Sequence, residues 1–141
     1  MKYTIEMMVQ KNREACIDGY LNPKHMMTWQ THLKNLENVQ GSWLEPQSVY
    51  MMHFDFGAHQ MHMKLTTQEN QLPDSIHLIY EVTGAWNLCI NHFKDLGNQT
   101  LWTMEVEFKF EVDPQLDINI FKQKTTESMD IFKQYMEQQY T

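Results

Sequence analysis

The chain has 141 residues, 42% of them hydrophobic and 21% charged, which is typical of one soluble globular domain spanning residues 1–141. Its net charge of -7 argues against a nucleic-acid partner, because phosphate binding needs a basic surface, and against an anionic membrane surface. We expect no membrane insertion, since no apolar run is long enough, and the first residues are typical of a strand rather than a signal peptide. The two cysteines, Cys16 and Cys89, indicate free thiols and a cytoplasmic location.

The first quarter of the chain predicts a strand followed by two short helices. Apolar and polar residues alternate over residues 2–9, which favours a strand. Asn12 can cap a helix that runs to about Tyr20. Asn22 can then cap a second helix, with Pro23 at its first position, running to about Trp29.

From Leu33 onward apolar and polar residues alternate with a period of two, which is typical of strands. Residues 33–40 and 48–56 are predicted strands, and the loop 41–46 between them carries Trp43, which we expect to be exposed. Gly57-Ala58 suits a two-residue hairpin turn. That turn sets every apolar residue of one strand opposite an apolar partner, so turn and pattern agree on one register. The facing pairs are Tyr50–Leu65, Met52–Met63, Phe54–Met61 and Phe56–His59.

Three more strands follow a predicted polar loop over residues 66–75. They cover residues 76–83, 85–94 and 99–111. If Leu96-Gly97-Asn98 forms a three-residue loop, Ile90 lies opposite Met104 and Trp86 faces the interior. A two-residue turn would instead bring Asn87, Cys89 and Asn91 inward. We favour the first register, because a buried asparagine needs a hydrogen-bond partner.

Residues 114–140 form the only long segment with a continuous helical pattern. Its apolar stripe must be buried against another element, and a curved sheet is the natural partner. Thr125 and Ser128 interrupt the stripe at its middle, where small side chains leave room for a cavity. The stripe consists of Ile118, Phe121, Thr125, Met129, Phe132 and Met136.

The order of these elements, together with short motifs, resembles the START-like (SRPBCC) superfamily and, within it, the polyketide cyclase/dehydrase-like proteins. The motifs are Lys2-Tyr3-Thr4-Ile5-Glu6, Asn22-Pro23 followed by Trp29, Leu72-Pro73, Asn91-His92-Phe93, Thr100-Leu101-Trp102, Phe108-Lys109-Phe110, Phe121-Lys122 and Phe132-Lys133. The resemblance implies an α+β helix-grip fold, in which a seven-stranded antiparallel sheet curves around the terminal helix. This chain departs from the superfamily at residues 41–44, where the superfamily usually has more glycine. The large Trp43 side chain in that loop is expected to narrow the pocket entrance.

The same resemblance implies an apolar cavity between sheet and helix. We expect the chain to bind or carry a small hydrophobic molecule there, without a bound cofactor. The alternatives are a cyclase- or isomerase-like enzyme using Tyr50, Tyr80 or His92, and a protein–protein adaptor resembling chaperone activators. The alternative to any cavity is an ordinary filled core. The expected ligand-binding residues are Tyr50, Met52, Phe54, Met61, Met63, Tyr80, Trp86, Trp102, Met104, Phe121, Thr125, Met129 and Phe132.

Two further clusters have simple interpretations. The hairpin register sets His53 opposite His62 on the outer sheet face, with Glu81 on the next strand. This ligand set can hold zinc, but an exposed sheet face lacks an enclosing shell, and we predict no metal. Trp29, Trp43 and the pair Met26-Met27 could form a patch for a partner protein, although such residues more often pack short helices onto a sheet.

Overall fold

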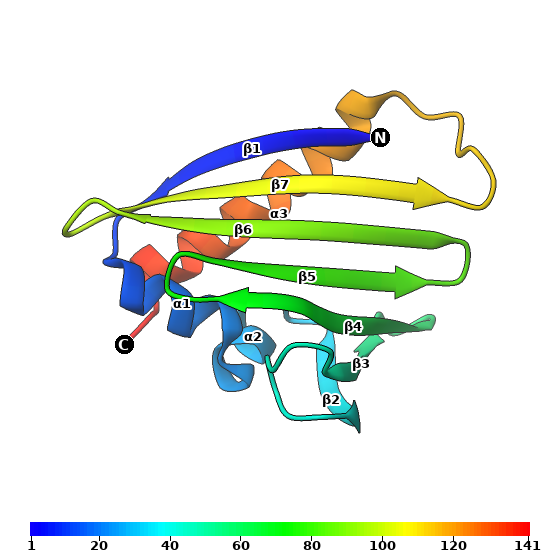
Figure 1. The fold of residues 1–141 in the computed structure, drawn as a ribbon, viewed down its shortest axis with the longest axis horizontal. Helices are drawn as coiled ribbons and strands as arrows, with labels where there is room; N and C mark the ends of the chain where they lie inside the picture. Colours follow the sequence, from blue (N-terminus) through cyan, green and yellow to red (C-terminus); the bar gives the residue numbers. More distant parts are fainter.

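A curved antiparallel sheet and a long helix lying across it make up most of the molecule (Figure 1). The computed structural model describes all 141 residues. The strand order is β1-β7-β6-β5-β4-β3-β2, which confirms the predicted helix-grip architecture. The strands are β1 (Lys2–Val9), β2 (Leu33–Gln40), β3 (Val49–Asp55), β4 (Gln60–Gln71), β5 (Ser75–Val82), β6 (Ala85–Asp95) and β7 (Thr100–Phe110), and the helices are α1 (Arg13–Leu21), α2 (Pro23–Trp29) and α3 (Ile118–Gln138).

Two asparagines set the bounds of the short helices, as predicted. The Asn12 side chain accepts a hydrogen bond from the Ala15 backbone N–H at 2.8 Å and begins α1. The Asn22 backbone N–H donates to the Asp18 carbonyl and ends α1, while its side chain accepts from the Lys24 N–H and begins α2. One residue therefore serves both helices.

The β3–β4 hairpin has the predicted register. Phe54 faces Met61, Met52 faces Met63 and Tyr50 faces Leu65. The Phe56 N–H donates to the His59 carbonyl at 3.0 Å across the turn. Gly57 has a φ of 84° there, a conformation that residues with a Cβ rarely adopt.

Two predicted boundaries were wrong. Residues 66–71 continue β4 instead of forming a polar loop, because the neighbouring strands supply their hydrogen bonds and their exposed side chains can be polar. Helix α3 begins at Ile118, four residues later than predicted, since Asp117 accepts the Asn119 N–H and caps the helix. Gln115 has a left-handed φ of 55°, which excludes it from the helix.

The core lies between the inner face of the sheet, α3 and the α1–α2 pair. Its largest fully buried side chains are Trp102, Phe93 and Phe132. Helix α1 approaches α3 so closely at Gly19 that an added Cβ would lie 2.2 Å from the Met136 sulfur.

Trp43 is half-buried rather than exposed. Its indole N–H donates to the Leu21 carbonyl at 2.9 Å, and its ring packs edge-on against Tyr50. The β2–β3 loop is thereby fastened to the end of α1. None of the helices is both long and apolar enough to cross a membrane.

Candidate functional site

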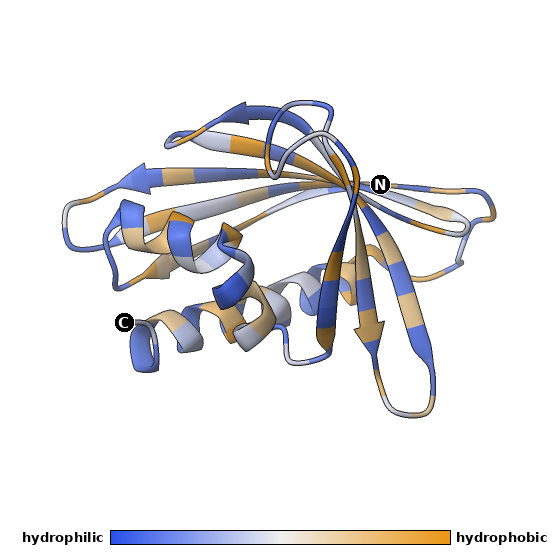
Figure 2. Cartoon of the chain, turned by 90° about the horizontal axis from the view of Figure 1, so that it is seen from below, coloured by the Kyte–Doolittle hydropathy of each residue, from blue (hydrophilic) through white to orange (hydrophobic).

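A cavity of about 340 Å³ lies between the sheet, the middle of α3 and the α1–α2 pair. Figure 2 shows α3 lying across one side of the fan of strands, with α1 and α2 beside it. The wall is mainly hydrophobic and draws on five strands and all three helices. It is formed by Tyr20, Trp29, Gln30, Met52, Phe54, Met61, Met63, Tyr80, Asn87, Cys89, Trp102, Met104, Thr125, Ser128 and Met129.

The sequence explains why a cavity forms at this place on α3. Met129 and Phe132 of the apolar stripe are buried, whereas the small side chains of Thr125 and Ser128 line the cavity and leave much of its volume unfilled. The Thr125 hydroxyl is instead 2.6 Å from the Tyr3 hydroxyl, which holds it toward β1. The predicted interruption of the stripe therefore coincides with the empty volume.

One side of the cavity continues into a shallower depression near the β3–β4 hairpin. Both share Trp29, Gln30, Phe54 and Ser128. The depression adds Thr31, His32, Phe56 and Ile131, of which Phe56 and Ile131 are exposed. Ser128 thus lies where the cavity meets the surface. Trp43 lines neither volume. The prediction that Trp43 narrows the pocket entrance is therefore wrong for this opening.

Nine of the thirteen predicted ligand-binding residues line the cavity, and four do not. Tyr50 packs against Trp43, and Phe121 packs against Phe108 near the start of α3. Phe132 is fully buried in the aromatic core, behind Tyr20 and Trp102. The nine are Met52, Phe54, Met61, Met63, Tyr80, Trp102, Met104, Thr125 and Met129.

Trp86 was misplaced because the register that we favoured for β6 and β7 was wrong. The structure pairs Asn91 with Met104 and Asp95 with Thr100, as the two-residue turn requires. Trp86 therefore lies outside the cavity, with the Lys109 ammonium 4.5 Å from its ring centre. His92 also faces outward, where it contacts Glu105. The partner that Asn91 needs is the Trp102 indole, whose N–H donates to the Asn91 carbonyl oxygen at 3.0 Å.

Six residues of the wall were not among the thirteen predicted ligand-binding residues, although one of them, Ser128, was expected to leave room for a cavity. Asn87 and Cys89 enter with the corrected register of β6. Tyr20, Trp29 and Gln30 come from α1 and the end of α2, which the sequence pattern could not place over the sheet. The only feature of the sequence that could have indicated them is that the two predicted helices end in aromatic residues, Tyr20 and Trp29.

Burial dominates the electrostatics of the wall. It raises the pKa of the Tyr20 and Tyr80 hydroxyls well above the ordinary value for tyrosine, and that of the Cys89 thiol to about 12. All three groups are therefore neutral at physiological pH. The wall includes no lysine, arginine, histidine, aspartate or glutamate.

This burial predicts slow cysteine chemistry. Because thiolates react with alkylating reagents and thiols do not, iodoacetamide at pH 8 should modify Cys89 at least a hundredfold more slowly in the folded than in the denatured protein. Mass spectrometry of timed samples measures both rates. Equal rates would contradict the placement of Cys89 in the interior.

The predicted histidine pair exists, with a different carboxylate. The Nδ1 atoms of His53 and His62 are 2.7 Å apart, and Glu37 of β2 binds the other His53 nitrogen at 2.8 Å. Glu81 instead pairs with Lys64 at 3.8 Å. No group of three or more histidine, cysteine, aspartate or glutamate residues is arranged to hold a metal ion.

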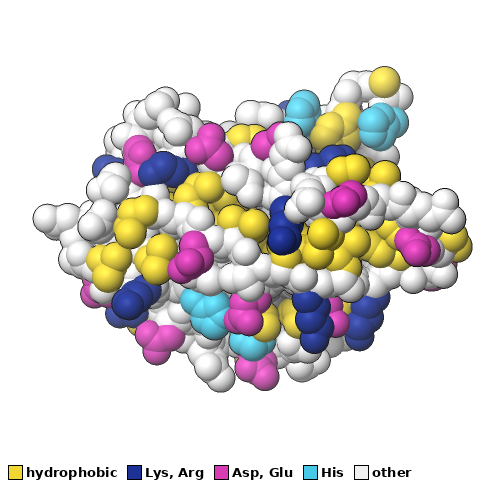
Figure 3. Space-filling view, turned by 90° about the horizontal axis from the view of Figure 1, so that it is seen from above, with side chains coloured by type: hydrophobic (Ala, Val, Ile, Leu, Met, Phe, Trp, Pro, Cys, Tyr) yellow, Lys and Arg dark blue, Asp and Glu magenta, His cyan; other side chains and the backbone are white.

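On the surface shown in Figure 3, lysine and arginine side chains are scattered among acidic ones.

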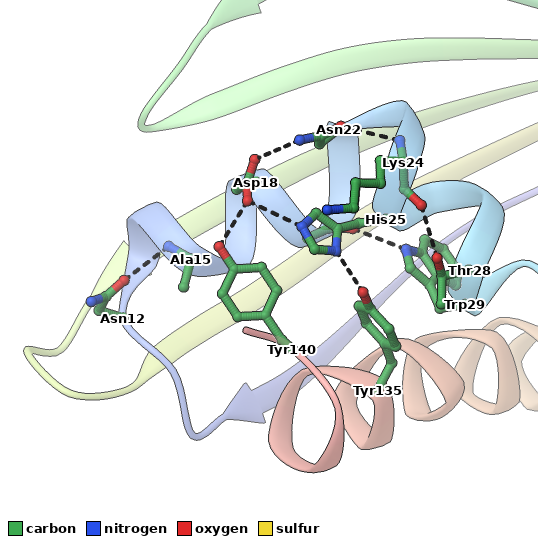
Figure 4. Close-up of polar contacts among 11 residues, drawn as sticks. Asn12, Ala15, Asp18, Asn22, Lys24, His25, Thr28, Trp29, Tyr135 and Tyr140 are labelled. Atoms are coloured by element: carbon green, nitrogen blue, oxygen red, sulfur yellow. Dashed lines mark hydrogen bonds and ion pairs between the residues drawn. The ribbon is translucent and has the colours of Figure 1, made fainter.

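A second polar cluster joins α1 and α2 to the end of α3 (Figure 4). The His25 ring is buried, with Nδ1 2.5 Å from the Tyr135 hydroxyl and Nε2 3.4 Å from the Asp18 carboxylate. Tyr140 donates to the same carboxylate at 2.8 Å. The Tyr140 hydrogen bond, with smaller contributions from Asn22 and His25, lowers the pKa of Asp18. The cluster lies outside the cavity wall, and we interpret it as a clamp between helices.

Comparison with known proteins identifies the fold. No family model and no curated protein matches the sequence. The solved structure of Ara h 8.0201 has a TM-score of 0.80 at 10% identity and covers 96% of this chain and 97% of its own. Protein Mll3558 from Rhizobium loti has a TM-score of 0.76 at 12% identity, covering 94% of each chain. Ginseng major latex-like protein 151 from Panax ginseng has a TM-score of 0.73 at 10% identity and covers 96% of this chain and 97% of its own.

Proposed function

Because this chain has the helix-grip fold of the START-like superfamily, we propose that it binds or carries a small hydrophobic molecule between the sheet and α3. The observation that supports this most is the cavity of about 340 Å³, eleven of whose fifteen lining residues are hydrophobic. Its volume is about twice that of the ~150 Å³ cavity that holds benzene in another protein. The flexible side chains of Met52, Met61 and Met63 let its wall adapt to different shapes.

The other candidate functions have less support. An enzyme using acid–base chemistry needs a group whose pKa lies near the working pH, whereas burial moves those of Tyr20, Tyr80 and Cys89 away from it. An adaptor needs an exposed aromatic patch, but Trp29 stacks on Tyr20 and Trp43 packs against Tyr50. The free thiols of Cys16 and Cys89 agree with a protein of the cytoplasm.

The test is to fill the mouth of the cavity. Ser128→Phe places a ring where the cavity meets the surface and should weaken the binding of naphthalene at least tenfold, as measured by ligand-observed NMR. The matched control is Glu127→Phe, which adds the same ring at an adjacent exposed position that does not line the cavity. It should leave binding unchanged.

Two results would overturn the proposal. One is that the unmodified protein binds no naphthalene, and the other is that both variants bind it as tightly as the unmodified protein. Native mass spectrometry of the protein isolated from its own host complements the test, since a co-purifying small molecule would reveal the natural ligand.

A further inference from the structure

The depression beside the cavity exposes two large apolar side chains to water. Phe56 is 39% exposed and Ile131 is 56% exposed, and both line the depression. Single exposed apolar residues are common on protein surfaces. These two, however, belong to a volume of about 170 Å³ that shares part of its wall with an apolar cavity. Apolar surface that continues a cavity in this way is typical of contact with a ligand.

The aromatic side of the depression is ordered by its own contacts. The rings of Phe54 and Phe56 stack with centroids 6.0 Å apart, and the His59 ring stacks on Phe56 at 5.2 Å. The His32 ring lies 4.8 Å from the Phe56 ring. The His32 carbonyl accepts a hydrogen bond from the Asp55 N–H at 2.9 Å, which joins the chain before β2 to the hairpin. A surface that is already ordered binds a flat ring at a low cost in conformational entropy.

Two polar side chains lie where the cavity and the depression meet. Ser128 and Gln30 line both volumes. Their hydroxyl and side-chain amide can each donate and accept a hydrogen bond. Ile131 lies three residues after Ser128 on α3 and therefore on the same side of that helix. A ligand that extends from the cavity to Ile131 thus passes a hydroxyl and an amide on the way.

The size and charge of the two volumes restrict their occupant. The cavity, at about 340 Å³, has about twice the volume of the ~150 Å³ cavity that holds one benzene ring, and the depression is close to that smaller size. Neither volume is lined by lysine, arginine, aspartate or glutamate. A charged group that entered the cavity would lose its hydration without gaining an ion pair.

From this arrangement we propose that the ligand is an uncharged molecule with two apolar parts joined by a polar link such as a carbonyl group. The larger part fills the cavity, the link lies beside Ser128 and Gln30, and the smaller part rests on Phe56 and Ile131 in the depression. The inference rests on the proposed function, because it names the chemical class of the ligand for the same cavity.

A pair of probes with one and two apolar parts tests the use of the depression. 2-Benzylnaphthalene adds a phenyl ring to naphthalene through one CH₂ group. Ligand-observed NMR gives the affinity ratio of 2-benzylnaphthalene to naphthalene for the unmodified protein and for Phe56→Ser. We expect the ratio to fall about five- to tenfold in Phe56→Ser, because the phenyl ring loses the aromatic surface on which it rests.

The matched control for this substitution lies in another hairpin turn. Leu96 is 40% exposed and lines neither volume. Its backbone N–H donates to the Gln99 carbonyl at 3.0 Å, as the Phe56 N–H does to the His59 carbonyl. Leu96→Ser therefore removes an equally exposed apolar side chain from the same place in its turn, and it should leave the ratio unchanged.

A second variant keeps the test decisive. Ile131→Ser should lower the same ratio if Phe56→Ser folds poorly, and thermal melting identifies that case. An unchanged ratio in folded Phe56→Ser and Ile131→Ser overturns the inference. Binding of naphthalene in that case leaves the proposed function standing, whereas failure of the unmodified protein to bind any probe ends both.

A third probe tests the polar link. 2-Benzoylnaphthalene has a carbonyl group in place of the CH₂ group of 2-benzylnaphthalene. The affinity ratio of ketone to hydrocarbon should fall about two- to tenfold in the double variant Ser128→Ala/Gln30→Leu, which corresponds to the loss of one hydrogen bond. Thr126→Ala removes a hydroxyl from an exposed residue of α3 that lines neither volume, and it should leave the ratio unchanged. An unchanged ratio in the double variant would overturn the placement of a polar link at this junction.

Discussion

Replacing Phe132 with alanine should lower the free energy of unfolding by about 3–5 kcal/mol. Phe132 is 0% exposed, and its ring packs edge-on against Tyr20, Trp29 and Trp102 with centroid distances of 5.3, 5.3 and 5.1 Å. The substitution removes apolar area and leaves a void that the three surrounding rings cannot close. Thermal and urea denaturation measure the loss, which corresponds to a fall in melting temperature on the order of 10–20 °C.

The adjacent residue supplies the control for this prediction. Ile131 precedes Phe132 on α3 and is 56% exposed, so Ile131→Ala should change stability by no more than about 0.5 kcal/mol. If the two alanine variants melted at the same temperature, the orientation of α3 against the sheet would be wrong.

The clamp around His25 should have the second-largest effect on stability. His25→Leu removes the partner of the buried Tyr135 hydroxyl, which should cost about 1–3 kcal/mol for the unpaired group. Tyr135→Phe removes the same bond from the other side. Because the two residues share one interaction, the double variant should be less destabilised than the sum of the single variants.

A control on the same helix separates the clamp from general damage to α2. Met27 lies two residues from His25 and is 37% exposed, so Met27→Ala should be close to neutral. Strict additivity of the two clamp substitutions in chemical denaturation would show that the contact between His25 and Tyr135 contributes no stability.

Much of the fold could be predicted because the local signals agree with one another. Asn12, Asn22 and Pro23 have definite preferences at helix ends, and the Gly57-Ala58 turn admits one register that pairs all apolar residues. The stripe on α3 likewise has a period that only a helix satisfies. For these elements, propensity, turn chemistry and burial all favour the same arrangement.

The part of the site that could not be predicted depends on a tertiary contact. Both registers of β6 and β7 were open, and the choice between them turned on whether Asn91 had a partner. That partner is Trp102 of the neighbouring strand, whose position itself depends on the register. The apolar pattern therefore favoured the register that places Trp86 inside. The hydrogen bond from Trp102 to Asn91 instead stabilises the other register. Similarly, Tyr20 and Trp29 join the wall through packing between helices, which leaves no periodic signal.

The shared cap at Asn22 has a consequence for motion. Since the same residue ends α1 and begins α2, neither helix can unravel at that junction without disturbing the other. The two helices should therefore open as one cooperative unit, with backbone amides that exchange hydrogen at a common rate. Such an opening would withdraw Tyr20 and Trp29 from the cavity in a single event. The interior would then be reached without separating any strand of the sheet from its neighbours.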